Sequence, residues 1–290
     1  MYFYQYIIDM IYEIVGKLLS ESLLSLYPVF VKNIGLPLTL QTWSRCFSYA
    51  LISGFFIDYQ FVYRALTSSS GILLALTTIA HIYTSYRGFE LLESGVAYSL
   101  FYVYPILILL IAHKQIHPII LLALFGVFLL VSDEKFNVMN VIKSPEGFVM
   151  ILLAALTEAS IYFLVRDIKT TNNWNHVFIS YFLGAILFSA YFFANSLKKY
   201  TSETFFSSIS ETLSSRLSFS LGINSVIGLF GYLLRFFAIT RLDTYLYASL
   251  SYFGIVMAFI YGIFINGETI NLQKMIGALL IVLTNLVIIV

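Results

Sequence analysis

The chain reads Glu93-Ser94-Gly95-Val96-Ala97-Tyr98-Ser99-Leu100-Phe101-Tyr102 and, about 150 positions later, Asp243-Thr244-Tyr245-Leu246-Tyr247-Ala248-Ser249-Leu250-Ser251-Tyr252. In both stretches an acidic residue opens an apolar run of about 20 residues, which is the length of one membrane-spanning helix. A glycine lies inside the next apolar run of each, at Gly126 and at Gly277. Internal repetition of this kind predicts that the architecture itself is duplicated.

The composition does not fit a domain that water solvates on all sides. Of the 290 residues, 60% are hydrophobic and 11% are charged, and the mean hydropathy is +0.89. Soluble domains carry about 25% charged residues. The 22 Tyr and 27 Phe suit a surface that faces lipid and its interfaces. The expected partner is therefore the lipid bilayer.

Charge and cysteine content exclude other classes. The net charge of +1 gives no electrostatic reason to expect a nucleic-acid partner. The single cysteine, Cys46, excludes an internal disulfide framework and any metal site built from cysteines. We therefore predict no metal, no cofactor and no nucleic-acid binding.

Apolar segments of nearly membrane-spanning length follow one another along the chain, at about 20 residues per helix. The ten segments are 10–31, 37–57, 69–90, 94–113, 116–132, 146–166, 175–195, 218–240, 244–265 and 271–290. The polar stretch 133–145 separates a first half, 1–132, from a second half, 146–290, with five segments each. Because five is odd, two such halves in tandem enter the membrane from opposite sides. The sequence thus predicts an all-α polytopic membrane protein of ten transmembrane helices in two inverted five-helix repeats.

Two motifs resemble parts of a known repeat. The run Ser85–Ala97, followed by an apolar helix with Pro105, resembles the third and fourth helices of an EamA-type repeat. The run Gly262–Ile270, with its Gly-Glu turn, resembles the end of that repeat. The chain therefore resembles the drug/metabolite transporter superfamily, with EamA-like repeats at 1–132 and 146–290. The resemblance implies a central substrate cavity, both termini in the cytoplasm and a place in the inner (plasma) membrane of the cell, as a monomer or homodimer.

Two carboxylates fall at mid-membrane in equivalent helices. Glu21 lies near the middle of 10–31, and Glu158 lies near the middle of 146–166. An ionisable group there costs about 2.5–3.5 kcal/mol on insertion scales, so its presence needs a reason. Aligning the halves places the two glutamates three positions apart, within one helical turn. We predict that they carry a proton or bind a cationic substrate; the alternative is that they only join neighbouring helices by hydrogen bonds.

Polar side chains of the third and eighth segments extend this predicted site. His81 lies in the middle of 69–90, where it either relays protons or donates one hydrogen bond across the bundle. Arg235 lies deep in 218–240, so it either faces the cavity or pairs with Glu158 or Glu21. Lys17 stands four residues from Glu21 and four from Glu13, and either pair is possible.

Tyrosines are the remaining candidates for substrate contact. Tyr232 shares a helix face with Arg235, and Tyr102 ends the first of the repeated stretches. Both are predicted to line a cavity and to stack on a substrate, with packing as the alternative. Other polar residues near segment ends are expected to cap or pack helices. These are Arg45, Glu93, Asp243 and Glu268, together with an interfacial pair between Arg87 and Glu90.

These observations favour a secondary active transporter. We expect it to move a small polar metabolite, amino-acid-like, cationic or adenosine-bearing, by alternating access with exchange or proton coupling. An organic-phosphate or nucleotide antiporter is the alternative, although the ninth segment, 244–265, holds no basic residue. A membrane-embedded lipid-modifying enzyme is a further alternative, which the chain's lack of a His-Glu-x-x-His motif and of a glycine-rich phosphate loop argues against. A non-transporting scaffold or receptor would leave the paired mid-membrane charges unexplained.

Overall fold

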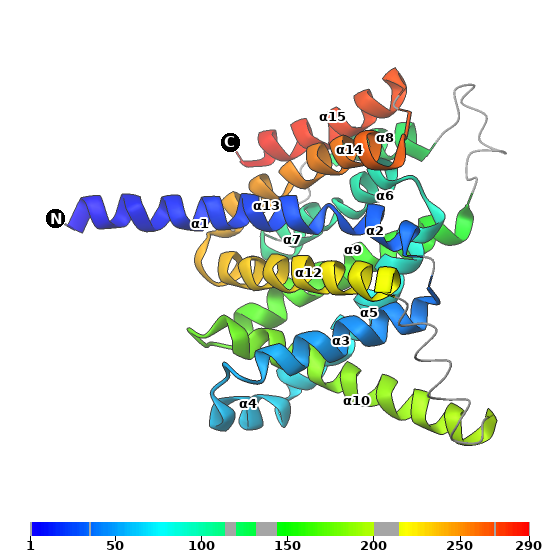
Figure 1. The fold of residues 1–290 in the computed structure, drawn as a ribbon. Helices are drawn as coiled ribbons and strands as arrows, with labels where there is room; N and C mark the ends of the chain where they lie inside the picture. The colour runs from blue at the N-terminus through cyan, green and yellow to red at the C-terminus, as the bar shows by residue number, and fades with distance from the viewer. Residues whose placement is uncertain are drawn as a thin grey trace.

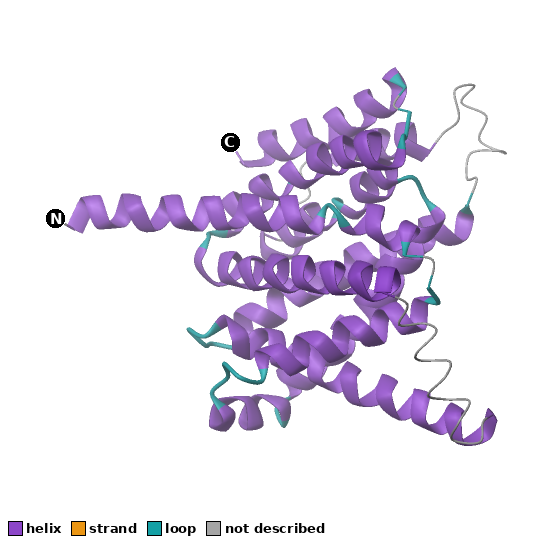
Figure 2. Ribbon diagram, viewed as in Figure 1, coloured by secondary structure: helices purple, strands orange, loops and turns teal. Residues whose placement is uncertain are grey.

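A computed structural model describes residues 2–34, 36–113, 120–131, 144–199, 215–269 and 271–289. These residues form helices and short turns, with no strand among them (Figure 2). The helices are α1 (Tyr2–Leu24), α2 (Tyr27–Asn33), α3 (Leu38–Ser53), α4 (Tyr59–Leu66), α5 (Ser69–Leu91), α6 (Ser94–Phe101), α7 (Tyr104–His113), α8 (Ile120–Val131), α9 (Pro145–Asp167), α10 (Asn173–Lys199), α12 (Ser215–Arg241), α13 (Thr244–Ser251), α14 (Phe253–Asn266) and α15 (Leu272–Ile289).

Within the described residues, six stretches are helical, long and apolar enough to cross a membrane. They are Asp9–Asn33, Ser94–Ala112, Pro145–Asp167, Asn173–Ala194, Ser220–Arg241 and Thr244–Asn266. A seventh results if α4 and α5, bent by 82° at their junction, form one span. The chain is thus an all-helical, multi-pass membrane protein, as the sequence predicts.

The other predicted segments also contain helices. Segments 37–57, 116–132 and 271–290 coincide with α3, α8 and α15, outside the six. A helix that the sequence did not suggest, α4, begins after Asp58, whose side chain accepts hydrogen bonds from the amides of Gln60 (3.0 Å) and Phe61 (3.1 Å). Most of the predicted dividing stretch 133–145 lies outside the described residues.

The two repeated stretches fold in the same way. Helices α6 and α13 begin at Ser94 and Thr244 and end at Phe101 and Ser251, 150 positions apart in both cases. Each is followed at once by a second helix, α7 or α14, so each span is broken. Pro105 explains the first break, because its ring would clash with the carbonyl four residues earlier, at Phe101. The break after Ser251 forms without a proline.

The helices pair along their lengths and enclose a central region. Helix α5 packs along α9, and α1 packs along α12. Helices α3 and α10 lie together on one side of these, and α8 and α15 lie together on the opposite side (Figure 1). The first part of α1 projects beyond the bundle (Figure 1). The four helices α1, α5, α9 and α12 therefore supply the walls of the centre.

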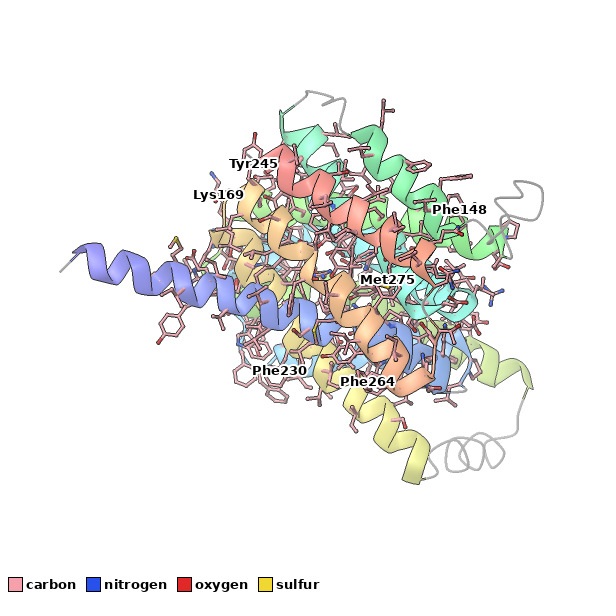
Figure 3. All side chains as sticks on the ribbon, turned by 90° about the horizontal axis from the view of Figure 1, so that it is seen from above. Phe148, Lys169, Phe230, Tyr245, Phe264 and Met275 are labelled. Atoms are coloured by element: carbon pink, nitrogen blue, oxygen red, sulfur yellow. The ribbon has the colours of Figure 1, made fainter. Side chains whose placement is uncertain are left out.

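Large apolar side chains cover much of the outside. Phe230 on α12, Phe264 on α14 and Met275 on α15 are labelled in Figure 3, and Phe264 is 83% exposed. Apolar side chains exposed on several helices would be unfavourable in water and are favourable against lipid chains.

Candidate functional site

A cluster of four charged side chains lies buried at the centre of the bundle. Arg235 on α12 donates from Nη1 to Glu158 on α9 (2.7 Å) and from Nη2 to both carboxylate oxygens of Glu21 on α1 (3.2 and 3.1 Å). Lys17, one turn before Glu21 on α1, pairs with the same carboxylate. All four side chains are at most 1% exposed. The alternatives that the sequence left open for Arg235 and Lys17 are resolved as pairing within this cluster.

The cluster balances its own charge. Two carboxylates face one guanidinium and one ammonium, so its formal charge is zero. An isolated buried ion is very unfavourable, and only opposite charges with satisfied hydrogen bonds compensate its loss of hydration. The planar fork of Arg235 suits two carboxylates at once. Three helices, α1, α9 and α12, are thus tied together by charge at the centre.

Tyr102 reaches the cluster from the break between α6 and α7. Its hydroxyl donates a hydrogen bond to Glu21. The approach depends on Gly254 in α14, because a Cβ there would lie 2.1 Å from the Tyr102 hydroxyl and 3.0 Å from Glu21 Oε2. The first repeated stretch therefore supplies a ligand of the cluster, and the second supplies the space that the ligand needs.

His81 stands between the cluster and Tyr232. Its Nδ1 lies 3.2 Å from the carbonyl of Ala154, and its Nε2 lies 3.1 Å from the Tyr232 hydroxyl and 3.3 Å from Glu158 Oε2. With the proton on Nδ1, that nitrogen donates to Ala154, and Nε2 accepts from Tyr232. Glu158 Oε2 then has no hydrogen-bond partner. A single added proton on Nε2 would charge His81 and turn its 3.3 Å contact with Glu158 Oε2 into an ion pair.

The structure brings all six predicted site residues together at the centre: Glu21, Glu158, His81, Arg235, Tyr102 and Tyr232. Their role in transport stays a prediction. Tyr104 also reaches the cluster: its ring lies 5.8 Å from the Arg235 guanidinium, and its hydroxyl bonds Ser251 (3.0 Å).

The residues expected to cap or pack helix ends divide into three groups. Asp243 caps α13 by accepting from the amide of Leu246 (2.9 Å), and Arg87 binds Glu90 (2.7 Å) as expected. Glu93 pairs with Lys274 and makes no side-chain cap for α6. The expectation for Arg45 is wrong in position: it lies in the middle of α3, not at a helix end, and it is buried among tyrosines.

Glu268 caps α6 from the turn after α14. Its carboxylate accepts from the amide of Ser94 (2.9 Å) and from Lys32 Nζ (3.3 Å). Gly267, with φ of +64°, makes the left-handed turn that presents it. Partial burial works against the charged form, but the hydrogen bonds from Ser94 and the charge of Lys32 outweigh it, so the pKa of Glu268 is lowered from its ordinary value.

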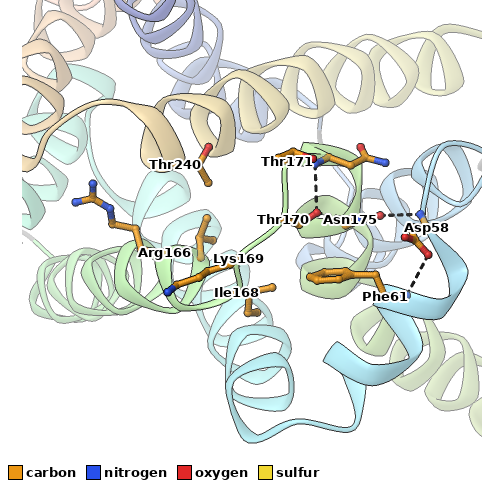
Figure 4. A pocket seen from close by; sticks show the side chains of 11 residues that line it. Asp58, Phe61, Arg166, Ile168, Lys169, Thr170, Thr171, Asn175 and Thr240 are labelled. Atoms are coloured by element: carbon orange, nitrogen blue, oxygen red, sulfur yellow. Dashed lines mark hydrogen bonds between the residues drawn. The ribbon is translucent and has the colours of Figure 1, made fainter.

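A pocket of about 570 Å³, lined by both polar and apolar residues, lies at one end of the bundle. Lys169, Thr170 and Asn175 line it (Figure 4), and Asn175 donates to Thr170 (3.0 Å) while accepting from the amide of Asp58 (2.9 Å). None of the central charged residues lines this pocket. The centre is closed in this structure, since its charged side chains are buried there.

In the described part of the chain, no three His, Cys, Asp or Glu side chains are placed to hold a metal ion.

Comparison with known proteins places the chain in a family. The model of the EamA-like transporter family matches residues 145–290, which is half of the chain. No curated protein matches. A solved structure described only as "Crystal structure of protein" is similar over 95% of both chains, with 14% sequence identity and a TM-score of 0.56, and this likeness shows the fold alone. The chain belongs to the EamA-like transporter family and is a membrane transporter of the drug/metabolite type.

Proposed function

We propose that this protein is a secondary active transporter that moves a small polar metabolite by alternating access, with the central cluster as its substrate and coupling site. The observation that carries the proposal is the unpartnered Glu158 Oε2, which lies 3.3 Å from His81 Nε2 inside a charge-balanced, buried cluster. A purely structural cluster gains nothing from an unsatisfied buried acceptor, which costs about 1–3 kcal/mol.

The architecture that supports this mechanism is ten helices in two inverted repeats, 1–132 and 146–290, joined by 133–145. In this assignment α1 and α9 are the first helices of the two repeats, and α5 and α12 are their third helices. The first helix of one repeat then packs along the third helix of the other, as α1 with α12 and as α9 with α5. Both pairs are observed, and both are extensive. The cluster draws Glu21 from one repeat and Glu158 and Arg235 from the other. Rocking the repeats apart would therefore separate the charges and open the site.

Proton uptake would loosen the centre in a defined way. One proton added to the pair of His81 and Glu158 raises the formal charge of the cluster from zero to one. The carboxylate of Glu158 then shares its charge between His81 and Arg235, so its hold on Arg235 weakens. Loss of the proton restores the closed arrangement. A cationic substrate group could occupy the same position as the proton, which couples substrate and proton by competition.

The expected substrates are amino-acid-like, cationic or adenosine-bearing metabolites. Arg235 is already neutralised by Glu21 and Glu158, so it is not free to hold an organic phosphate. Tyr102 and Tyr232 supply aromatic surface beside the carboxylates. We place the protein in the inner (plasma) membrane, as a monomer or homodimer that performs no chemical conversion.

Solute exchange tests the proposal. Purified protein is reconstituted into liposomes loaded with a mixture of amino acids, polyamines, nucleosides and nucleotides, and mass spectrometry measures which solutes leave when the same mixture, isotope-labelled, is outside. We expect one class to exchange faster than in protein-free liposomes, with an accompanying change in internal pH for a proton-coupled process. Release equal to that from protein-free liposomes for every solute would contradict the proposal.

A further inference from the structure

A second buried arginine, Arg45 on α3, lies outside the central cluster. Its side chain is 2% exposed, and its Nη2 donates to the hydroxyl of Tyr181 on α10 (2.9 Å). Its Nε is buried without a hydrogen-bond partner. Among the described residues, no salt bridge includes Arg45, whereas Arg235 binds two carboxylates. Arg45 is therefore a buried positive charge that none of the described acidic side chains neutralises.

Five tyrosine rings surround this guanidinium, and we call them the tyrosine cage. The distances from Arg45 Cζ to the ring centres are 4.7 Å for Tyr27, 5.6 Å for Tyr49, 5.4 Å for Tyr86, 5.5 Å for Tyr181 and 4.6 Å for Tyr232. The rings come from α2, α3, α5, α10 and α12. Cation–π contacts attract the charge, but each is weaker than a buried ion pair.

The side chains of the cage are tightly packed, and one polar atom beside them has no hydrogen-bond partner. The hydroxyls of Tyr27 and Tyr49 meet at 2.5 Å over Gly228, where a Cβ would lie 1.5 Å from the first and 1.9 Å from the second. Asn224, one turn before Gly228 on α12, donates to the hydroxyl of Tyr86 (3.4 Å), while its Oδ1 is buried without a partner. The cage therefore depends on a glycine and retains free hydrogen-bonding groups.

We propose that Arg45 and the tyrosine cage form an anion-binding site for a carboxylate. One guanidinium without an ion-pair partner and with a free Nε donor matches a group of charge minus one, and the hydroxyl of Tyr181, which accepts from Nη2, can donate its own proton to the same group. A phosphate dianion would require a second cation, and the rings around Arg45 bring none. The site is closed in this structure, so a carboxylate would enter when the bundle opens, and in this respect the inference rests on the proposed transporter function.

The position of the cage beside the central cluster also indicates which kind of substrate would carry this carboxylate. Tyr232 lies between the two sites: its ring is 4.6 Å from Arg45 and 5.5 Å from Arg235, and its hydroxyl bonds His81. A free donor at Arg45 and a free acceptor at Glu158 thus stand on either side of one tyrosine. A zwitterion with its carboxylate at Arg45 and its ammonium at Glu158 would satisfy both.

Anion-dependent thermal unfolding tests the carboxylate site without knowledge of the substrate. Purified wild type is unfolded in sodium chloride, sodium propionate and sodium phosphate at equal ionic strength. We expect propionate to raise the unfolding temperature by about 2 °C or more over chloride, because a ligand bound only by the folded protein stabilises it. Arg45→Met should lose this response, and Arg45→Lys should keep part of it.

Matched controls separate this site from the rest of the protein. Arg87→Met removes a partly exposed arginine and should respond to propionate like the wild type. Glu158→Gln should also keep the response while losing transport, so failure of the proposed function and failure of this inference are distinguishable. No response to propionate in the wild type, or an equal response in Arg45→Met, would overturn the carboxylate site. A larger response to phosphate than to propionate would overturn the choice of anion.

Discussion

Two arginines in this molecule hold two carboxylates each, in very different surroundings. The carboxylates are Glu21 and Glu158 for Arg235, and Glu90 and Glu146 for Arg87. The shortest contact is 2.7 Å in both sets. The Arg235 side chain, however, is 1% exposed and the Arg87 side chain is 31% exposed. Ion pairs of the same length therefore contribute differently to the free energy of unfolding at the centre and at the end of the bundle.

This difference in burial indicates that the ion pairs of Arg87 are structural, whereas those of Arg235 serve function. An exposed ion pair contributes about 0–1 kcal/mol, and water can replace either partner. Burying ions gains little over apolar packing, yet breaking a buried pair costs about 3–5 kcal/mol. A charge cluster at the centre is therefore a poor choice for stability alone. We attribute its presence to the binding and release of a charged substrate or proton, whereas Arg87 joins the ends of α5 and α9.

Removing each arginine tests this comparison with the largest expected effect. Arg235→Met leaves two buried carboxylates facing only Lys17, so we expect the free energy of unfolding to fall by about 3–5 kcal/mol. Arg87→Met should cost about 1 kcal/mol or less. Thermal unfolding of both variants in detergent measures the difference.

A charge-restoring second substitution shows whether the loss is electrostatic. The double variant Arg235→Met with Glu158→Gln leaves Lys17 opposite Glu21, so the formal charge returns to zero. We expect it to be more stable than Arg235→Met alone. Equal instability of the two variants, or equal stability of Arg235→Met and Arg87→Met, would argue against a charge-balanced centre.

Filling the space beside Tyr102 should have an intermediate effect on the free energy of unfolding. Gly254→Ala places a methyl group against the Tyr102 hydroxyl, so we expect a loss of about 1–3 kcal/mol from overpacking. Removing that hydroxyl with Tyr102→Phe should reduce the cost of the alanine. Gly222→Ala is the control, because a Cβ there has no neighbour within 4 Å; it should not destabilise the protein and should gain up to about 1 kcal/mol from helix propensity. If both alanines behave alike in thermal unfolding, the contact between Tyr102 and Gly254 is absent.

The helix-end carboxylate Glu268 should give the smallest effect, and one that depends on pH. Its folded pKa is lowered from 4.5, so its contribution is fully present above about pH 4.5 and is lost as the pH falls through the folded value. Glu268→Gln should cost about 1 kcal/mol at pH 7, as for loss of a helix cap. Thermal unfolding of both proteins from pH 7 to pH 3.5 should show the difference shrinking with acid. A difference that stays constant over this range would exclude the ionised cap.

Much of the fold follows from apolar segment lengths and repetition. The 150-position offset places the matching helices α6 and α13, because an apolar run of fixed length in lipid has few alternatives to a helix. Helix α4 escaped prediction since it is short and its start depends on one Asp58 cap. The breaks inside the predicted segments 94–113 and 244–265 also escaped prediction; the second has no proline to mark it, and its shape depends on contacts with α1 and α7.

The central residues could be found from sequence because lipid makes buried charge conspicuous. Glu21, Glu158 and Arg235 stand out inside apolar runs, and the structure joins them. Arg45 was misplaced for a physical reason: its partners are tyrosines from five helices, and an aromatic cage leaves no periodic signal in one segment. Which carboxylate each cation selects also depends on helix packing, which residue spacing alone does not determine.

Replacing Glu158 tests whether the central cluster couples transport to a proton. Wild type, Glu158→Gln and the matched control Glu146→Gln, an exposed glutamate on the same helix, are reconstituted into liposomes, and exchange of the solute that the wild type transports is measured with internal pH. We expect Glu158→Gln to lower flux by about 10²-fold or more while the protein still purifies folded, as for loss of a proton-transfer group, and Glu146→Gln to transport like the wild type. Normal flux by folded Glu158→Gln would contradict this coupling.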